Sequence, residues 1–190
     1  MANPRLPRPL ALFSGTHSKI SALLQDFEGT MKYHTTIGNT KYIVPHTSLD
    51  TREQLETFIK HCNYFAPRMR EYGIELGFHN HSGEFKVSAE GFYAHKELEE
   101  RADIFFELDT YWVFAAGLDP LATMERLKDR TKVIHLKDSG VSLGSGNAPI
   151  KAVRDKATEL GIEIVVESEG CNPTGREEVQ RCMDYLRTID

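Results

Sequence analysis

Residues 73–85 read GIELGFHNHSGEF, and this stretch decides the fold. After its opening glycine, residues 74–78 form a short, largely apolar run, which is typical of a strand buried on both faces. The run then gives way abruptly to His79, His81 and Glu84. A buried strand that ends in imidazoles and a carboxylate places reactive polar side chains at the edge of the hydrophobic core, and this indicates a functional site.

Similar runs recur along the chain, and segments with helical spacing of apolar residues separate them. Strands are predicted over residues 10–14, 41–44, 74–78, 103–109, 132–138 and 162–169. Helices are predicted over residues 19–37, 52–72, 90–101, from 119 onward, 149–160 and 176–187. Pro67 lies inside the second helical pattern and predicts a kink or a break there. Strict alternation of strand and helix predicts a parallel sheet with right-handed crossovers.

Four of the predicted strands carry a charged or imidazole side chain at or just past their ends, namely Glu84 just past its strand, Asp109, His135 and Glu167. In a doubly wound sheet these strand ends would lie along a line, whereas a parallel barrel brings them together on one face. The predicted fold class is therefore α/β, an incomplete (β/α)8 TIM barrel with about six βα units. We expect one such domain over residues 1–190.

The bulk composition is that of an ordinary globular protein, with 40% hydrophobic and 27% charged residues. A net charge of -5 argues against nucleic acid as a partner, because nucleic-acid-binding domains usually carry a basic face. No apolar run approaches the roughly 20 residues of a membrane span, and no signal peptide is recognisable. The cysteines, Cys62, Cys171 and Cys182, match no zinc motif and predict reduced thiols in the cytoplasm.

Glu84, Asp109, His135 and Glu167 together make a set of ligands for a divalent metal ion. Carboxylate and imidazole suit Mn²⁺, Mg²⁺, Co²⁺ or Zn²⁺. Such an ion polarises a carbonyl and stabilises an enediolate. Glu84 and Glu167 are the predicted catalytic pair, which would move a proton off one substrate carbon and back. The alternative for each of these side chains is an ordinary hydrogen bond at a strand end.

Further residues at the strand ends are candidates for substrate binding. His17, His79 and His81 follow strands and are expected to reach the substrate or to make structural hydrogen bonds. Lys137 is expected to reach a substrate oxygen or to pair with a neighbouring carboxylate, and Trp112 is expected to form the pocket wall.

Two more expectations concern residues beside the predicted site. Glu107 and Glu169 are expected to face away from it. Gly144 and Gly146 lie in a glycine-rich loop whose amides could hold a phosphate. A lone Gly-Ser-Gly is weak evidence for such a site, and we interpret this loop as a turn.

Five segments in this order resemble the xylose isomerase-like (AP endonuclease family 2) TIM barrels, in the branch of sugar phosphate isomerases and epimerases. They are GFHNHSGEF at 77–85, FELDTYW at 106–112, IHLKD at 134–138, LGSG at 143–146 and VVESE at 165–169. The resemblance implies a metal held by Glu84, Asp109, His135 and Glu167, with the two glutamates as the acid–base pair. The sequence departs from the family pattern at Trp112, where several sugar epimerases have a substrate-binding histidine.

The resemblance also implies that the first two βα units of the barrel have no counterpart in this sequence. A barrel without two strands exposes two sheet edges. Either another chain supplies the missing part, or the open side is covered by dimerisation, or the sequence is a gene remnant. Of these we expect a homo-oligomer, most simply a dimer, that covers the open side.

The predicted function is a metal-dependent sugar isomerase or epimerase that acts on a sugar or polyol-derived ketone by proton transfer next to the carbonyl. A dehydratase acting on a keto-inositol fits the same residues, because elimination begins with the same proton abstraction. A non-catalytic barrel that binds metal or sugar as a subunit is a further alternative. A DNA-repair endonuclease shares the fold, but it needs more histidines and is disfavoured by the acidic charge.

Overall fold

The computed structural model describes residues 14–189. Within this range six parallel strands form one sheet in sequence order, β1-β2-β3-β4-β5-β6. The strands are β1 (Thr16–His17), β2 (Lys41–Val44), β3 (Glu75–His79), β4 (Phe105–Asp109), β5 (Thr131–Leu136) and β6 (Glu163–Val166). The strand predicted over residues 10–14 lies, apart from Ser14, outside the described residues.

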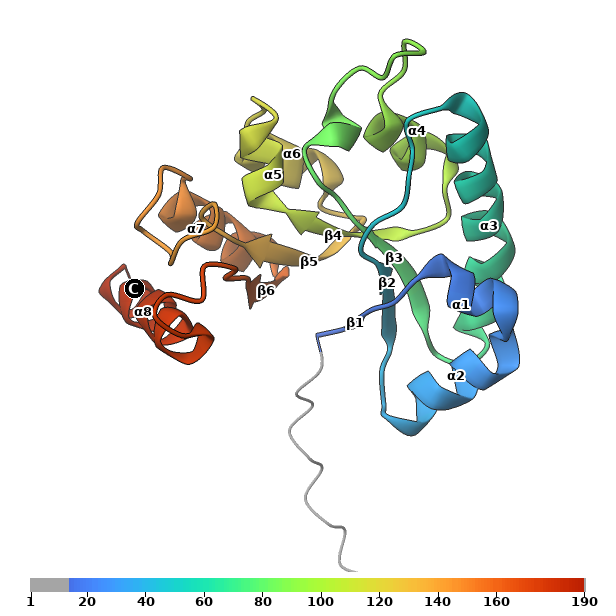
Figure 1. The fold of residues 1–190 in the computed structure, drawn as a ribbon, viewed down its shortest axis with the longest axis horizontal. Coiled ribbons are helices and arrows are strands. Elements are labelled where there is room, and N and C mark those ends of the chain that lie inside the picture. The colour runs from blue at the N-terminus through green and yellow to red at the C-terminus, as the bar shows by residue number, and fades with distance from the viewer. Residues whose placement is uncertain (1–13, 190) are drawn as a thin grey trace, which may run out of the picture.

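Helices follow the strands and lie around the outside of the sheet (Figure 1). They are α1 (Ile20–Gln25), α2 (Phe27–Thr36), α3 (Arg52–Arg70), α4 (Ala94–Arg101), α5 (Thr110–Ala115), α6 (Pro120–Leu127), α7 (Ile150–Leu160) and α8 (Gly175–Thr188), with the short 3₁₀ helix η1 (Gly83–Phe85). The predicted alternation and the parallel sheet are confirmed. No helix among the described residues is long and apolar enough to cross a membrane.

The sheet is strongly curled, and an ion pair across its concave face shows by how much. Lys41 on β2 and Glu163 on β6 lie four strands apart in the sheet, yet their Nζ and Oε2 atoms are 2.7 Å apart. In a flat sheet four strand spacings would separate them by about 19 Å. The strands β1 and β6 are the two edges of the sheet and do not pair with each other. The molecule is therefore an incomplete TIM barrel, as the sequence predicts.

Two helices differ from the prediction. The single helix expected over residues 19–37 is interrupted at Asp26, whose carboxylate accepts a hydrogen bond from the Gly29 amide and so begins α2. In contrast, α3 continues past Pro67 to Arg70 without a break. Pro67 lies on the exposed side of the last turn, where water can satisfy the carbonyl that loses its partner.

The core lies between the sheet and the helices. Large side chains such as Phe58 from α3, Phe78 from β3 and Leu98 from α4 are almost fully buried there. This layer holds the strands rigidly, so the residues at their carboxyl ends have fixed relative positions.

Candidate metal centre and adjoining pocket

Glu107 on β4 lies at the centre of a buried cluster of imidazoles. Its Oε2 atom is 2.5 Å from Nε2 of His17 and 3.4 Å from Nδ1 of His79, and its Oε1 atom is 3.3 Å from Nε2 of His135. These three histidines come from β1, β3 and β5, so only a curled sheet can bring them to one carboxylate. The expectation that Glu107 faces away from the site is wrong. It lies two residues before Asp109 on one strand, and such residues share a face.

A second group of side chains lies beyond Glu107, at the carboxyl ends of the strands. His79, Asp109, His135 and Glu167 each offer one donor atom, and these atoms lie within 4.8 Å of one another. Nδ1 of His135 is 2.9 Å from Oε2 of Glu167. The structure thus brings together three of the four predicted metal ligands and adds His79. We call these four side chains the strand-end cluster.

Backbone and amide contacts fix the positions of two members of the strand-end cluster. Asp109 and His135 are direct cross-strand neighbours in the β4–β5 pairing. The amide side chain of Asn80, just after β3, donates from Nδ2 to the Asp109 carbonyl and accepts from the Asp109 amide on Oδ1. These two bonds tie the end of β3 to the end of β4, so His79 and Asp109 are held at a constant separation.

The ionisable side chains of the strand-end cluster and the adjacent Glu107 shift one another's pKa values. Burial alone would lower the pKa of His135, but the carboxylates of Glu107 and Glu167 raise it to about 10. Burial alone would raise the pKa of Glu107, but the adjacent imidazoles of His135, His17 and His79 hold it well below its usual range. For Asp109, burial and the nearby charge of Glu167 raise the pKa to about 7.

One carboxylate oxygen in the cluster has no hydrogen-bond partner. Oδ1 of Asp109 accepts a hydrogen bond from the Trp112 amide, whereas Oδ2 is buried and has no partner in the described part of the chain. A buried, unpaired carboxylate oxygen is costly, and a bound cation would remove this cost. With the neighbouring imidazoles and Glu167, it offers the mixed nitrogen and oxygen donors that suit a divalent transition metal. The residues therefore fit a metal ion.

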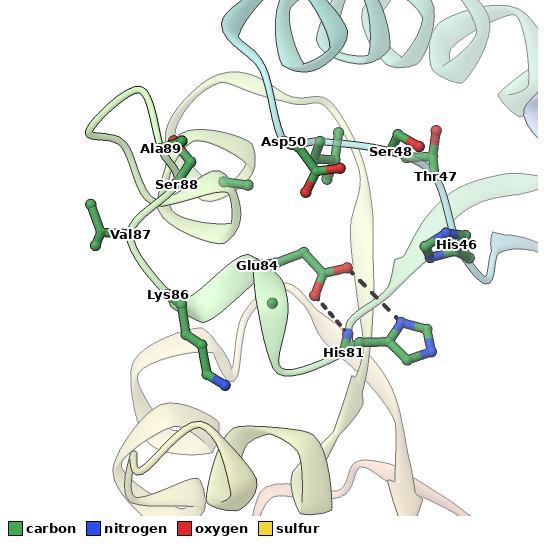
Figure 2. Close-up of a pocket in the computed structure, with 13 residues that line it drawn as sticks. His46, Thr47, Ser48, Asp50, His81, Glu84, Lys86, Val87, Ser88 and Ala89 are labelled. Carbon is green, nitrogen blue, oxygen red and sulfur yellow. Dashed lines mark hydrogen bonds and ion pairs between the residues drawn. The ribbon is translucent and has the colours of Figure 1, made fainter.

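Glu84 lies apart from the strand-end cluster. It belongs to η1, where its Oε2 atom accepts a hydrogen bond from the His81 amide at 3.0 Å and its Oε1 atom lies 3.9 Å from Nδ1 of His81 (Figure 2). Glu84 belongs to neither group of potential ligands found among the described residues. Its predicted role as a metal ligand is therefore still a prediction.

Glu84 and His81 line a cavity of about 660 Å³ between two loops (Figure 2). One loop, residues 46–50, follows β2 and the other, residues 81–89, follows β3. Polar groups on its wall include the side chains of His46, Thr47, Ser48, Asp50, Lys86 and Ser88. The ring of His81 lies 5.0 Å from that of His79 and 5.7 Å from that of His46, measured between centroids. His81 thus separates the pocket from the strand-end cluster.

The comparisons with known proteins agree with this architecture. The family model for the xylose isomerase-like TIM barrel matches residues 11–189. The chain belongs to this family. A sugar phosphate isomerase/epimerase from Parabacteroides distasonis has a similar structure, with a TM-score of 0.77 and 27% identity, over 88% of this chain and 64% of that one.

Two more distant relatives add to this comparison. Inosose dehydratase from Mesomycoplasma hyopneumoniae is 25% identical over 182 residues, which is 80% of this chain and 60% of the relative. The IolI protein, whose crystal structure contains a zinc atom, is similar in fold at 14% identity, with a TM-score of 0.65 over 93% of this chain and 73% of that one. The chain spans less than two thirds of the dehydratase and of the Parabacteroides protein.

The remaining predicted substrate-binding residues also lie near the carboxyl ends of the strands. Lys137 is buried; its Nζ atom lies 2.9 Å from Oε2 of Glu169 and 3.5 Å from Oε2 of Glu167, and 4.9 Å from the centre of the Trp112 ring. Burial opposes the charge on Lys137, but Glu169 and Glu167 raise its pKa. Glu169 therefore contacts a predicted site residue, although we expected it to face away. We call Glu107 and the three histidines around it, His17, His79 and His135, the inner group. His17 is its most exposed member.

The glycine-rich loop is a turn built around Asp138. The carboxylate of Asp138 accepts hydrogen bonds from the amides of Gly144, Gly146 and Ala148. These amides have a protein carboxylate as their acceptor, in the place that a bound phosphate would take. The interpretation of this loop as a turn is confirmed.

Proposed function

We propose that this chain binds a divalent metal ion at its strand ends and catalyses proton transfer next to the carbonyl of a sugar or polyol-derived ketone. The observation that carries this proposal is the buried Asp109 carboxylate. Its Oδ2 atom has no partner among the described residues, and the carboxylate offers a donor atom within 4.8 Å of those of His135 and Glu167. When bound there, a divalent cation would polarise the substrate carbonyl. The similarity to a sugar phosphate isomerase/epimerase supports the same class of reaction.

Glu167 is the side chain that we propose as the base. Its side chain is 26% exposed, so a substrate can reach it from the open side of the cluster. Burial opposes ionisation of Glu167, but His135 and Lys137 lower its pKa to about 2. The side chain is therefore a carboxylate at neutral pH, the form that accepts a proton. The proton leaves the carbon next to the carbonyl, and the electron pair of the broken C–H bond moves toward the carbonyl oxygen.

Glu84 is the proposed second carboxyl group of the reaction. It lines the pocket beside the cluster and is nearly buried. A substrate that extends from this pocket past His81 to the cluster would lie between Glu84 and Glu167. Return of the proton to the former carbonyl carbon, with transfer of the hydroxyl proton from the neighbouring oxygen to the former carbonyl oxygen, gives the isomer. Return of the proton to the opposite face of the same carbon gives the epimer. Lys137 and His81, which both lie next to the Trp112 ring, are proposed to orient the substrate oxygens.

A dehydratase is the second candidate, and the similarity to inosose dehydratase favours it. The first step is the same removal of a proton next to the carbonyl. The electron pair then expels a hydroxide from the adjacent carbon, and that hydroxide leaves as water with one proton. The residues named above serve both reactions, so the products must distinguish them.

The test is exchange of substrate hydrogen in heavy water. We expect metal-loaded protein to incorporate deuterium at the carbon next to the carbonyl of a ketose or a keto-inositol, detected by proton NMR, and Glu167→Gln to abolish this exchange. A new isomer identifies the isomerase or epimerase, and loss of 18 mass units identifies the dehydratase. Binding of metal and ketone without any exchange would contradict both and favour a non-catalytic binding subunit.

We also propose that a second copy of the chain covers the open side of the sheet in a cytoplasmic homodimer. The edges β1 and β6 are unpaired within the described sheet, and unpaired edges invite association. Cys62, Cys171 and Cys182 are free thiols, which suits a reducing compartment. Native mass spectrometry should give twice the chain mass, and a monomer at micromolar concentration would contradict the dimer.

A further inference from the structure

We propose that His79, rather than Glu84, is the fourth ligand of the metal ion at the strand ends. This inference rests on the proposed metal site and makes it specific. It changes the ligand set from three carboxylates and one imidazole to two carboxylates, Asp109 and Glu167, and two imidazoles, His79 and His135.

The positions of the two candidates differ clearly. A donor atom of His79 lies within 4.8 Å of those of Asp109, His135 and Glu167, whereas Glu84 belongs to no such group found among residues 14–189. His79 is the last residue of β3, and its backbone is held by the β3–β4 pairing opposite Glu107. Glu84 lies five residues farther along, in η1, and its carboxylate is already engaged by the His81 amide.

Glu107 orients both imidazoles toward the metal position. It approaches one nitrogen of each ring, Nδ1 of His79 at 3.4 Å and Nε2 of His135 at 3.3 Å. The other nitrogen of His135, Nδ1, points to Glu167. A histidine that binds a metal usually donates its second N–H to a carboxylate, which fixes the tautomer and the ring orientation. With Nδ1 of His79 directed at Glu107, its Nε2 is the nitrogen available to the strand-end cluster.

Nδ1 of His79 is buried and makes no well-aligned hydrogen bond within the described structure. His79 is 3% exposed, so bulk solvent does not reach this nitrogen. Rotation of the ring toward a bound metal ion would improve the Nδ1–H hydrogen bond to Glu107 while Nε2 binds the ion. A second imidazole ligand shifts the preference of the site away from Mg²⁺ and toward Zn²⁺, Co²⁺ or Mn²⁺.

The first part of the test counts the imidazoles bound to Cu²⁺, used as a spectroscopic probe, by pulsed electron paramagnetic resonance. We expect two coordinated imidazoles in the wild-type protein and in Glu84→Gln, and one in His79→Asn. His17→Ala is the control for the inner group, and it should retain two. One imidazole in the wild-type protein, or three that fall to two in His17→Ala, would overturn the proposal.

The second part measures Zn²⁺ affinity by competition with a chromophoric chelator. We expect His79→Asn to weaken binding by more than about tenfold, the lower end of what loss of even an outer-shell partner costs. Glu84→Gln should bind Zn²⁺ as the wild-type protein does. Weaker Zn²⁺ binding in Glu84→Gln and unchanged binding in His79→Asn would overturn the assignment of His79 but leave the proposed function standing. Wild-type protein that binds neither Cu²⁺ nor Zn²⁺ would overturn both. If His79→Asn fails to fold, the number of coordinated imidazoles in the wild-type protein and in Glu84→Gln still tests whether His79 is a ligand.

Discussion

Two buried aspartates at the ends of neighbouring strands have opposite surroundings. Asp138 follows β5, and its two carboxylate oxygens accept three backbone amides of the loop that wraps around it. Asp109 ends β4, and one of its oxygens has no partner among the described residues although both aspartates are fully buried. The first carboxylate is satisfied by backbone amides and stabilises a loop. The second fits the metal site that we propose, and this difference distinguishes a candidate site from a structural hydrogen bond.

The comparison is tested most strongly at Asp138. Asp138→Ala removes the carboxylate that accepts from three loop amides. We expect it to lower the free energy of unfolding by about 3 kcal/mol, because a hydrogen bond to a charged group contributes about 1.5–3 kcal/mol and partly exposed amides regain water. Urea unfolding followed by circular dichroism measures this loss. A loss below that of an exposed control, Asp184→Ala, would show that the loop does not depend on this carboxylate.

Glu107→Gln tests whether the inner carboxylate supports the strand-end cluster. The amide has one acceptor oxygen in place of two, and its NH2 group can only donate, so the histidine rings lose part of their orientation. We expect metal affinity to fall by about 10–100-fold, the usual cost of removing an outer-shell carboxylate. Zn²⁺ competition titration measures this change. Unchanged affinity, with the variant folded, would mean that Glu107 does not position the ligands.

Metal binding should strengthen as the pH rises. The metal needs ionised Asp109, whose pKa is raised to about 7, so about one tenth is ionised at pH 6 and about nine tenths at pH 8. Asp109 alone then predicts affinity about tenfold weaker at pH 6 than at pH 8. His135, with its pKa raised to about 10, must also lose a proton and adds to the effect in the same direction. Calorimetry in two buffers should detect proton release on binding, and pH-independent affinity would contradict this linkage.

Asp109→Asn should have the smallest effect on the metal-free protein. Folding raises the pKa of Asp109 above its ordinary value of 3.8, so the metal-free protein loses stability as the pH rises toward and through about 7. The asparagine cannot ionise, and its Oδ1 atom can still accept the Trp112 amide. At pH 8 we expect stability equal to that of the wild-type protein or higher, within about 1 kcal/mol. A loss as large as that of Asp138→Ala would mean that Asp109 is a structural carboxylate.

Much of the fold can be predicted from simple patterns in the sequence. The apolar runs and the helical spacing between them predict the parallel sheet, and curling of that sheet is enough to bring Asp109, His135 and Glu167 together. Alternation of side chains along β4 also predicts that Glu107 faces the site, because it lies two residues before Asp109 and therefore on the same face of the sheet. The expectation that Glu107 faces away neglects this alternation.

The position of Glu84 could not be predicted in the same way. It comes after the end of β3, where the path of the chain depends on η1 and on the hydrogen bond to the His81 amide rather than on strand periodicity. His79, in contrast, is still within the strand and keeps the register of the sheet. Periodicity therefore places residues up to the last paired position of a strand, and local turn chemistry sets the course of the chain beyond that position.

The most direct test of the account is thermal unfolding of EDTA-treated protein during titration with Mn²⁺. An ion that binds only the folded state stabilises it by about 2.7 kcal/mol at a hundred times its dissociation constant. We predict a saturable rise in melting temperature in the wild-type protein and none in Glu167→Gln. No rise in the wild-type protein, or an equal rise in both proteins, would contradict the assignment of the strand-end cluster as a metal centre.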